Sequence, residues 1–504
     1  MNKMVEISKI IDQNPWWKGK EFQFWKYDEH LAKYEIAKFK IHRKFVSPQS
    51  NNVYSISGPR QAGKTTWIKL MIRDLLDKEE IDASSVCYFS CDTLLSRSRK
   101  ELRKVLDYFL ERLAKFDKGF IFLDEVSYVK DWAFEIKNLA DSGKLSKISL
   151  FLSGSPLGIK EVEFLPGRHV EGNRYFLKPL SFREFVLNIL NLDVYWLRYL
   201  SSDVKLIEGL TLLKEKLEKN WLTLDEEFEV IKQKIESLLP FKDALDFLLN
   251  FYLRTGGFPS SIESYLINKK IERKIYETIV NVILSDISKR GKSEDIAKQV
   301  LYALIKRIGS AYDFRALTKD LEEGISVNTI IDYLKVFEDS FLIKTLYSYD
   351  FEKKQKRQKG NKKVYFTDPF LFYSILSWLE GKDGFEATED ILTSEEKISQ
   401  VLEMITFSSL QRTKEIPLIR DSSTFLWFYY DKKGEIDFIL KQESNEYLGV
   451  EVKYQPEVPK KIREIPMVKN YIILSKDTFE ASERVLIVPI SLFLALIKSS
   501  DYHL

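Results

Sequence analysis

Short apolar segments alternate with amphipathic stretches along the first 190 residues of the chain. The segments 52–57, 119–124 and 147–153 are short and mostly apolar, which is typical of strands buried inside a sheet. Helical periodicity follows the first of them, in the segment WIKLMIRDLL. Buried strands that alternate with helices predict an α/β domain with a parallel sheet.

The loop after the first strand matches the phosphate-binding pattern GxxxxGK[ST]. Its residues are Gly58, Pro59, Arg60, Gln61, Ala62, Gly63, Lys64, Thr65 and Thr66. Glycines let backbone N–H groups turn inward around phosphates, and the helix N-terminus adds partial positive charge. We expect Lys64 to reach the β- and γ-phosphates and the Thr65 hydroxyl to ligate Mg²⁺. The strand before and the helix after disfavour a chance match.

Two acids follow the second strand. Asp124 and Glu125 end the run GFIFLDE. We expect Asp124 to hold Mg²⁺ and Glu125 to polarise the attacking water; the alternative is ordinary turn chemistry. Ser153 ends the next strand, and we expect it near the γ-phosphate. Its alternative is an ordinary strand-end serine.

Arginines follow this strand on a loop, at Arg168 and Arg174. An arginine that stabilises transition-state charge, from the same chain or a neighbour, is common in phosphoryl transfer. Arg168 is the candidate for this role. The alternative is a surface arginine or a salt bridge.

Three short helical segments between residues 297 and 340 precede two strands, near 341–349 and 363–368. Ser326 is a good N-cap for the third helix. Three helices followed by a β-hairpin are the pattern of a winged helix-turn-helix. We therefore predict a winged helix.

A basic run lies between the two strands of this predicted hairpin. Its charged residues are Lys353, Lys354, Lys356, Arg357, Lys359, Lys362 and Lys363. At a wing tip these side chains would contact nucleic-acid phosphates, and affinity would fall steeply with salt. The alternative is a solvated loop, and the acids Asp332, Glu338 and Asp339 on the third helix oppose groove binding.

The motifs resemble those of a family. GPRQAGKTT, FIFLDEV, LFLSGSP, LKPLSFREF (177–185) and TGGFP (255–259) follow in the order seen in archaeal and bacterial AAA-like P-loop ATPases of the DUF4143/DUF234 type. In that family a winged helix and a C-terminal restriction-endonuclease-like, PD-(D/E)xK, domain follow the ATPase domain. The resemblance implies ATP rather than GTP as the nucleotide. A long helical insertion at 191–250 departs from the family pattern, and its simplest role is packing.

An acid cluster is predicted near the C-terminus. Asp437 lies in one strand, and Glu451 and Lys453 lie two residues apart on the next, so the last two share a face. This is the D…ExK arrangement of nucleases, in which Asp437 and Glu451 would bind Mg²⁺ or Mn²⁺ and Lys453 would help to activate water. The resemblance adds an acid from the preceding helix, where Glu403 matches best and Glu396 is the alternative. Plain cross-strand salt bridges are the alternative.

These patterns predict a multidomain α/β protein with a parallel-sheet AAA-type ATPase core, a helical lid and a C-terminal α/β domain. The predicted segments are a lead-in at 1–46, the ATPase core at 47–190, a helical insertion and lid at 191–295, a winged helix at 296–370, and the restriction-endonuclease-like domain at 371–504.

Composition argues against a disulfide-rich protein, a zinc protein and a membrane-spanning protein. The two cysteines are too few for a disulfide framework, and the four histidines are scattered without the spacing of zinc ligands. No run of 18 apolar residues occurs, so we expect no membrane span and a cytoplasmic location. The net charge of +3 does not by itself indicate nucleic acid.

Three functions remain open. The first is an ATPase coupled to nucleic-acid binding, with DNA as the expected partner and a metal-dependent nuclease as a further possibility. The second is an ATP-driven regulatory or assembly switch whose nuclease-like domain is catalytically inactive and only binds nucleic acid or protein. A role linked to RNA or defence is a third. Paired or rotary action would require a homo-oligomer, because we find one nucleotide motif.

Overall fold

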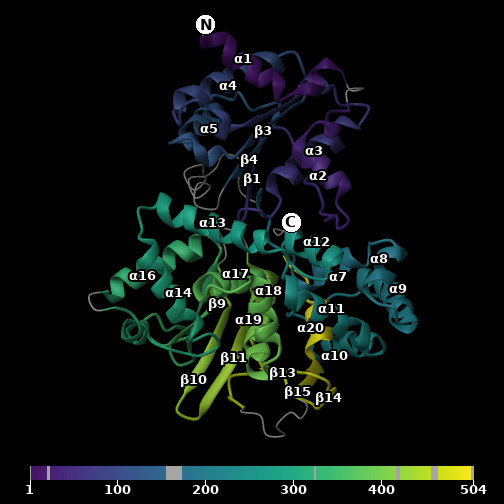
Figure 1. Ribbon diagram of the computed structural model, residues 1–504, viewed down its shortest axis with the longest axis vertical. Coiled ribbons are helices and arrows are strands. Elements are labelled where there is room, and N and C mark those ends of the chain that lie inside the picture. Colours follow the sequence, from purple (N-terminus) through teal and green to yellow (C-terminus); the bar gives the residue numbers. More distant parts are fainter. Residues whose placement is uncertain are drawn as a thin grey trace. The chain divides into compact units, whose positions relative to one another are not determined.

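The chain forms two compact units, residues 1–178 and residues 179–501, in the computed structural model (Figure 1). The structure describes residues 2–19, 23–154, 173–322, 325–415, 421–455 and 464–500. The first unit ends at residue 178 rather than at the expected core boundary of 190. Residues 179–190 therefore belong to the C-terminal unit.

A five-stranded parallel sheet forms the centre of the N-terminal unit, with the strand order β2-β3-β4-β1-β5. The strands are β1 (Asn52–Ser57), β2 (Val86–Ser90), β3 (Gly119–Asp124), β4 (Ile148–Gly154) and β5 (Arg174–Phe176). Hydrogen bonds from both β4 and β5 place the strand before the phosphate-binding loop inside the sheet. This topology confirms the predicted α/β class with a parallel P-loop core.

Helices cover both faces of this sheet. They are α1 (Asn2–Asp12), α2 (Glu29–Ile36), α3 (Lys64–Leu76), α4 (Arg99–Leu113) and α5 (Trp132–Asp141). Neighbouring residues of a strand point to opposite faces: Val53 joins the apolar core with α4 and α5, whereas Tyr54 joins the core with α3. Tyr54 and Phe122 stack on Phe151 at 4.5 and 4.6 Å between ring centroids.

The segment 14–17 of the lead-in, with the sequence NPWW, pairs with the edge strand β2. The Asn14 amide donates to Tyr88 O and accepts from Tyr88 N, both at 2.7 Å. The indole nitrogens of Trp16 and Trp17 donate to Val86 O at 2.9 and 2.8 Å. These side chains satisfy backbone groups that an edge strand would otherwise expose.

Seven helices begin the C-terminal unit. They are α7 (Phe182–Ile189), α8 (Val194–Leu200), α9 (Val204–Lys219), α10 (Phe228–Glu236), α11 (Lys242–Thr255), α12 (Pro259–Asn268) and α13 (Arg273–Lys289). The buried Arg183 guanidinium donates to the carbonyls of Leu217, Asn220 and Ala495 at 2.7–3.0 Å. The insertion at 191–250 thus packs against the C-terminal end of the chain.

Three helices and an antiparallel hairpin follow. The helices are α14 (Glu294–Ile305), α15 (Phe314–Leu317) and α16 (Val327–Asp339), and the strands are β6 (Ile343–Tyr347), β7 (Tyr349–Asp350), β8 (Gln355–Lys356) and β9 (Lys362–Phe366). β6 pairs with β9, and Tyr312 adds a bridge to Lys362. Ser326 caps α16 by accepting from Thr329 N at 3.1 Å. These are the elements that the sequence predicts for this region.

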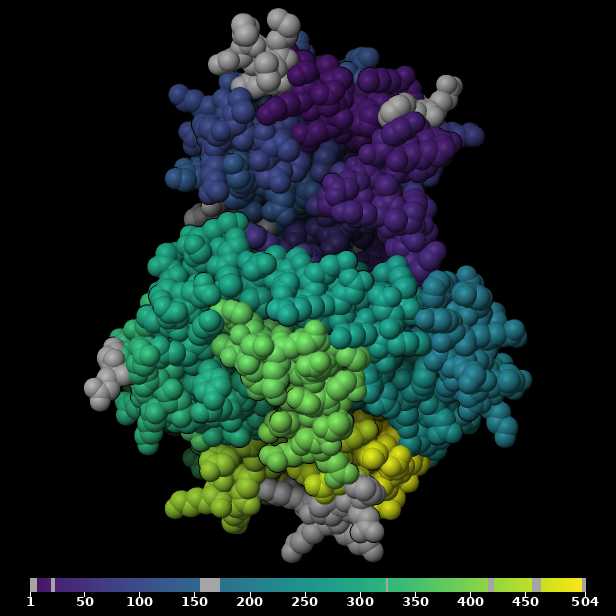
Figure 2. Space-filling view, viewed as in Figure 1, coloured from purple at the N-terminus to yellow at the C-terminus, as the bar shows by residue number. Residues whose placement is uncertain are grey.

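A six-stranded mixed sheet follows, with the order β10-β11-β12-β13-β15-β14. Its strands are β10 (Leu426–Asp431), β11 (Gly434–Lys441), β12 (Tyr447–Lys453), β13 (Asn470–Ser475), β14 (Glu480–Ala481) and β15 (Val485–Pro489). Helices α19 (Glu395–Lys414) and α20 (Ile490–Leu496) pack on this sheet, and α17 (Pro369–Glu380) and α18 (Gly384–Leu392) precede it in the chain. The β10–β11 hairpin, in yellow-green, projects from the lower surface in the space-filling view (Figure 2).

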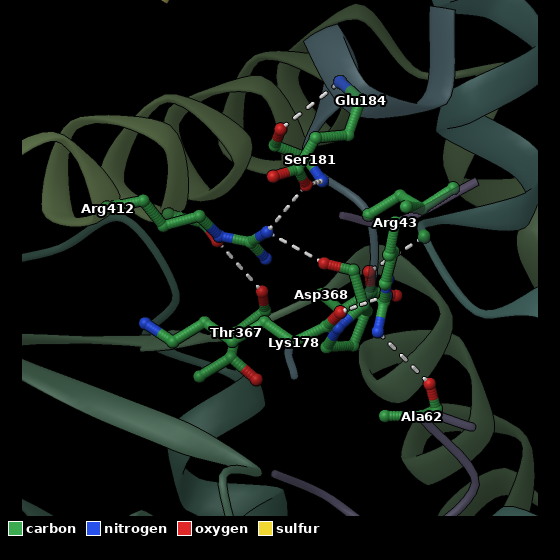
Figure 3. Close-up of polar contacts among 12 residues, drawn as sticks. Arg43, Ala62, Lys178, Ser181, Glu184, Thr367, Asp368 and Arg412 are labelled. Atoms are coloured by element: carbon green, nitrogen blue, oxygen red, sulfur yellow. Dashed lines mark hydrogen bonds and ion pairs between the residues drawn. The ribbon is translucent and has the colours of Figure 1, made fainter. Parts of the chain in front are cut away.

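The segments PLSFREF and TGGFP meet in one packed junction of the C-terminal unit. Arg412 donates to Pro179 O at 2.7 Å and lies 3.4 Å from Glu184 Oε2, and Figure 3 shows this side chain beside Ser181, Glu184 and Asp368. Gly257 N donates to Asp368 Oδ2 at 2.8 Å. These motif residues therefore hold the unit together.

Among the described residues, every helix is too short or too polar to cross a bilayer.

Candidate nucleotide site and C-terminal acid centre

The phosphate-binding loop connects β1 to α3 with a backbone that needs its glycines. Gly63 precedes α3 with φ +91°, a left-handed conformation that favours glycine. A Cβ atom on Gly58 would lie 2.2 Å from Leu177 O. The N-cap residue Gly63 has no side chain to cap α3, and the first N–H groups of a helix suit an anion such as phosphate.

Lys64 is buried at the start of α3. Its ammonium group donates to Gly58 O at 3.0 Å and to Pro59 O at 2.9 Å. The loop carbonyls thus hold the lysine within the cradle that the N–H groups form. Thr65 and Thr66 lie half-buried in the same first turn.

The acids after β3 lie beside the serine at the end of β4. The Ser153 hydroxyl donates to Asp124 Oδ1, and Glu125 N lies 3.3 Å from Ser153 Oγ and 3.1 Å from Asp124 Oδ1. Asp124 and Ser153 are both buried. The structure therefore brings together three of the residues that the sequence singled out.

Tyr88 on β2 also contacts this group. Its hydroxyl donates to Asp124 Oδ2 at 3.2 Å. Sequence reasoning missed Tyr88; the signal was a polar group inside an otherwise apolar strand, aligned with the strand that carries Asp124. The two Asp124 oxygens are thus held from β2 on one side and β4 on the other.

Glu125 has a strained backbone and an altered acidity. Its φ of +48° is unusual for a residue with a side chain, and such outliers concentrate at functional sites. Burial raises the pKa of Glu125, and Asp124 raises it further, whereas Lys64 and Arg60 lower it. The loop cations and the strand-end acids therefore share one electrostatic environment.

Arg168 lies outside the described residues. Arg174, the other arginine considered, is half-buried at the start of β5, opposite Ser55 of β1. The role of an arginine finger stays a prediction.

The predicted acid cluster of the C-terminal unit is assembled on β11, β12 and α19. Asp437 Oδ2 accepts from Val452 N at 2.9 Å, and Lys453 Nζ lies 3.2 Å from Glu451 Oε2. Glu403 reaches the same place from α19, because the Lys363 ammonium group donates to both Glu403 and Asp437. The chain thus brings together the four residues expected there.

Lys363 of β9 enters this cluster. Its ammonium nitrogen lies 2.6 Å from Glu403 Oε1 and 3.3 Å from Asp437 Oδ1, and it also pairs with Glu435. Its side chain is 1% exposed. We call Lys363, Glu403, Glu435, Asp437, Glu451 and Lys453 the acid centre.

The prediction of an exposed wing cation is wrong for Lys362 and Lys363. Both side chains are buried because β9, unlike the loop before it, packs inside the unit. Lys362 donates to Gly360 O at 2.8 Å and lies over the Phe314 ring at 4.7 Å. Burial lowers the pKa of Lys362.

The charges of the acid centre stabilise the Lys363 ammonium form. Burial acts to lower the pKa of Lys363, but the negative groups around it, Glu403 foremost, raise it well above its ordinary value. Burial raises the pKa of Glu403 to about 7, against the opposing effect of Lys363. Burial likewise raises the pKa of Glu435.

With the Lys363 ammonium group in place, the acid centre does not fit the Mg²⁺ or Mn²⁺ ion expected there. Within the described ranges, no group of three or more histidine, cysteine, aspartate or glutamate side chains is arranged to hold a metal ion. The point that Glu403, Glu435 and Asp437 surround is taken by an ammonium group.

Most other cations of the basic run are exposed to solvent. Lys353, Lys354, Arg357 and Lys359 are exposed, whereas Lys356 is half-buried and donates to Ser423 Oγ at 2.7 Å. Tyr349 stacks on Trp427 of β10 at 4.2 Å between ring centroids. The hairpin is therefore packed on the C-terminal sheet and leaves only its loop in solvent.

Comparison with known proteins matches residues 50–186 to an AAA domain and residues 246–382 to a domain of unknown function, DUF8612. The N-terminal unit thus has the fold of an AAA-type P-loop core. The comparison does not assign the C-terminal region to a nuclease-like family.

Two relatives from Methanocaldococcus jannaschii resemble most of the chain. The uncharacterized protein MJ1637 is 26% identical over 475 residues, covering 92% of this chain and 89% of the relative. The uncharacterized protein MJ1544 is 23% identical over 426 residues, covering 84% and 79%.

Solved AAA structures align weakly. The Holliday junction branch migration motor RuvB of Thermotoga maritima is 13% identical, with 68% of this chain and 91% of that chain covered and a TM-score of 0.24. Drosophila ORC bound to DNA is 12% identical, with 66% and 91% covered and a TM-score of 0.21. TM-scores this low carry no conclusion about this chain.

Proposed function

We propose that the protein binds and hydrolyses ATP with Mg²⁺ at the phosphate-binding loop. The observation that carries this proposal is the convergence of Lys64, Asp124, Glu125 and Ser153 at the ends of β1, β3 and β4. Backbone N–H groups of the loop and the Lys64 ammonium group hold the β- and γ-phosphates. The Glu125 carboxylate orients the attacking water and accepts its proton.

The oxygen donors of this site suit a hard cation. The Thr65 hydroxyl and the Asp124 carboxylate would hold Mg²⁺, which prefers oxygen ligands and phosphate. When bound, the ion neutralises charge that develops on the phosphates. Ser153 and Tyr88 fix the orientation of the Asp124 carboxylate.

A binding experiment tests the role of the loop. We expect wild-type protein to bind a slowly hydrolysed ATP analogue and Lys64→Ala to lose that binding, measured by titration calorimetry. Equal affinity of the two proteins would contradict the proposed site.

The ATPase is coupled, in this proposal, to nucleic-acid binding by the exposed part of the basic run, with DNA as the expected ligand. Lys353, Lys354, Arg357 and Lys359 extend into solvent from a hairpin that is fixed on the C-terminal sheet. Clustered cations on a firmly packed loop suit phosphates. The acids of α16 are partly compensated, since Asp332 pairs with Lys292 and Asp339 with Arg290.

Neutralising two lysines of the basic loop tests whether this loop binds nucleic acid. We expect the double variant Lys353→Gln/Lys354→Gln to bind duplex DNA more weakly, with a slope of log affinity against log salt smaller by about 2. The variant Lys115→Gln/Lys118→Gln removes two exposed charges from the N-terminal unit and should leave binding unchanged. Equal losses in both variants would contradict a role of the basic loop.

The second candidate is an ATP-driven regulatory or assembly switch whose C-terminal unit does not cleave. Lys363 favours it, because an ammonium group sits among the acids that a nuclease would use for metal. Metal-dependent cleavage is therefore not part of our proposal. A homo-oligomer with Arg168 acting on a neighbour belongs to this candidate, and sedimentation with and without the ATP analogue tests it.

A further inference from the structure

The acid centre has the residues of a cation site and already contains a cation. The carboxylates around Lys363 come from α19 and β11, whereas its ammonium group comes from β9. Lys363 is 40 residues from Glu403 and 74 residues from Asp437 in the sequence. Tyr365, two residues after Lys363 on the same strand, also donates its hydroxyl to Glu403 Oε1.

A buried ammonium group with this set of partners is stable. Lys363 has at least three carboxylates as ion-pair partners, and removal of one partner from a buried ion pair is strongly destabilising. An additional divalent cation at the same point would face this fixed positive charge. The centre can thus hold the lysine or a metal ion between these carboxylates.

We propose that Lys363 takes the place of the divalent cation in the acid centre, which makes the centre a metal-free clamp between the β6–β9 hairpin and the C-terminal sheet. Lys453 does not compete for this role, because it pairs with Glu451 and is 38% exposed. The clamp fixes the hairpin whose loop carries the exposed lysines. This inference does not depend on ATP hydrolysis at the N-terminal unit.

Metal binding by a variant that lacks the Lys363 charge tests the clamp. The parent protein carries Lys64→Ala and Asp124→Asn, which removes the metal site of the N-terminal unit. In this background we expect Lys363→Met, which keeps the side-chain length and removes the charge, to gain a Mn²⁺ site that raises its melting temperature. The parent should show no such rise, and adding Asp437→Asn to Lys363→Met should abolish it.

Two results would overturn the proposal. One is a Mn²⁺ site in the parent that Asp437→Asn removes, since the lysine would then not exclude the metal. The other is a folded Lys363→Met protein that gains no Mn²⁺ site.

A second measurement needs no substitution at Lys363. In wild-type protein we expect Lys363 to resist acetylation by acetic anhydride, with and without millimolar Mn²⁺, whereas the exposed Lys353 and Lys354 react. Mass spectrometry of peptides reports each lysine. Labelling of Lys363 that increases with Mn²⁺ would show that the metal displaces it and would reject the clamp even if Lys363→Met fails to fold.

Discussion

The Tyr88 hydroxyl donates a hydrogen bond to Asp124 Oδ2 at 3.2 Å. The other oxygen of this carboxylate accepts from Ser153. The acid that is expected to hold Mg²⁺ is therefore oriented by the strands on both sides of β3. A side chain held in this way needs little reorganisation when the ion binds.

Substitution of Tyr88 tests this positioning. Tyr88→Phe removes a hydrogen bond to a charged group, which contributes about 1.5–3 kcal/mol. We expect the Mg²⁺ concentration for half-maximal ATP turnover to rise about tenfold, whereas the maximal rate changes little. Tyr108→Phe, on α4 of the same unit, is the control. An unchanged Mg²⁺ requirement in Tyr88→Phe would contradict the role.

The junction in the C-terminal unit predicts an unusually damaging substitution. A Cβ atom on Gly257 would lie 2.1 Å from Leu180 O and 2.4 Å from Leu180 N, and these are backbone atoms that cannot rotate away. We expect Gly257→Ala to lower the free energy of unfolding of this unit by about 3 kcal/mol or more, measured by urea denaturation.

Gly209→Ala is the matched control. Gly209 lies in α9, and its added Cβ would be 3.8 Å from Ala244 Cβ, an ordinary contact. Because alanine favours helices, stability should stay equal or rise by up to about 1 kcal/mol. Equal losses in the two variants would mean that the close approach to Leu180 is not the cause.

The buried Asp368 predicts a pH dependence of stability. Burial raises its pKa to about 6, against the hydrogen bonds from Gly257 N and Phe370 N. In the unfolded chain its pKa is about 3.9, so the folded state binds the proton more tightly. The free energy of unfolding should therefore fall by about 3 kcal/mol as pH rises from about 4 to about 6, and this contribution should then level off.

The variant Asp368→Asn isolates this effect because its side chain does not titrate. We expect the difference in unfolding free energy, wild type minus variant, to decrease across the same pH range in urea denaturation. A difference that is independent of pH would show that Asp368 has the same acidity in the folded and unfolded states.

Much of the N-terminal unit could be predicted from the sequence because its signals are local. A buried strand, a glycine-rich loop and a helix follow directly in the chain, and the acids of β3 end a short apolar run. Tyr88 was missed because its partner is 36 residues away. Its function depends on strand order, which the sequence pattern does not specify.

The acid centre could be predicted from the sequence only in part. Glu435 could have been found, since it lies two residues before Asp437 and so on the same face of β11. Lys363 could not have been found, because it ends a run of lysines and arginines. Only its tertiary surroundings distinguish it from the other members of that run. The strand β9 buries Lys362 and Lys363, whereas Lys353 and Lys354 stay in solvent.

The most direct measurement is steady-state release of phosphate from ATP at saturating Mg²⁺ by wild-type protein and Glu125→Gln, with Glu111→Gln on the exposed face of α4 as control. The account predicts turnover by wild type and the control, and a loss of about a hundredfold or more in Glu125→Gln, with ATP still bound. Equal turnover by Glu125→Gln and wild type, or no turnover by wild type, would contradict it.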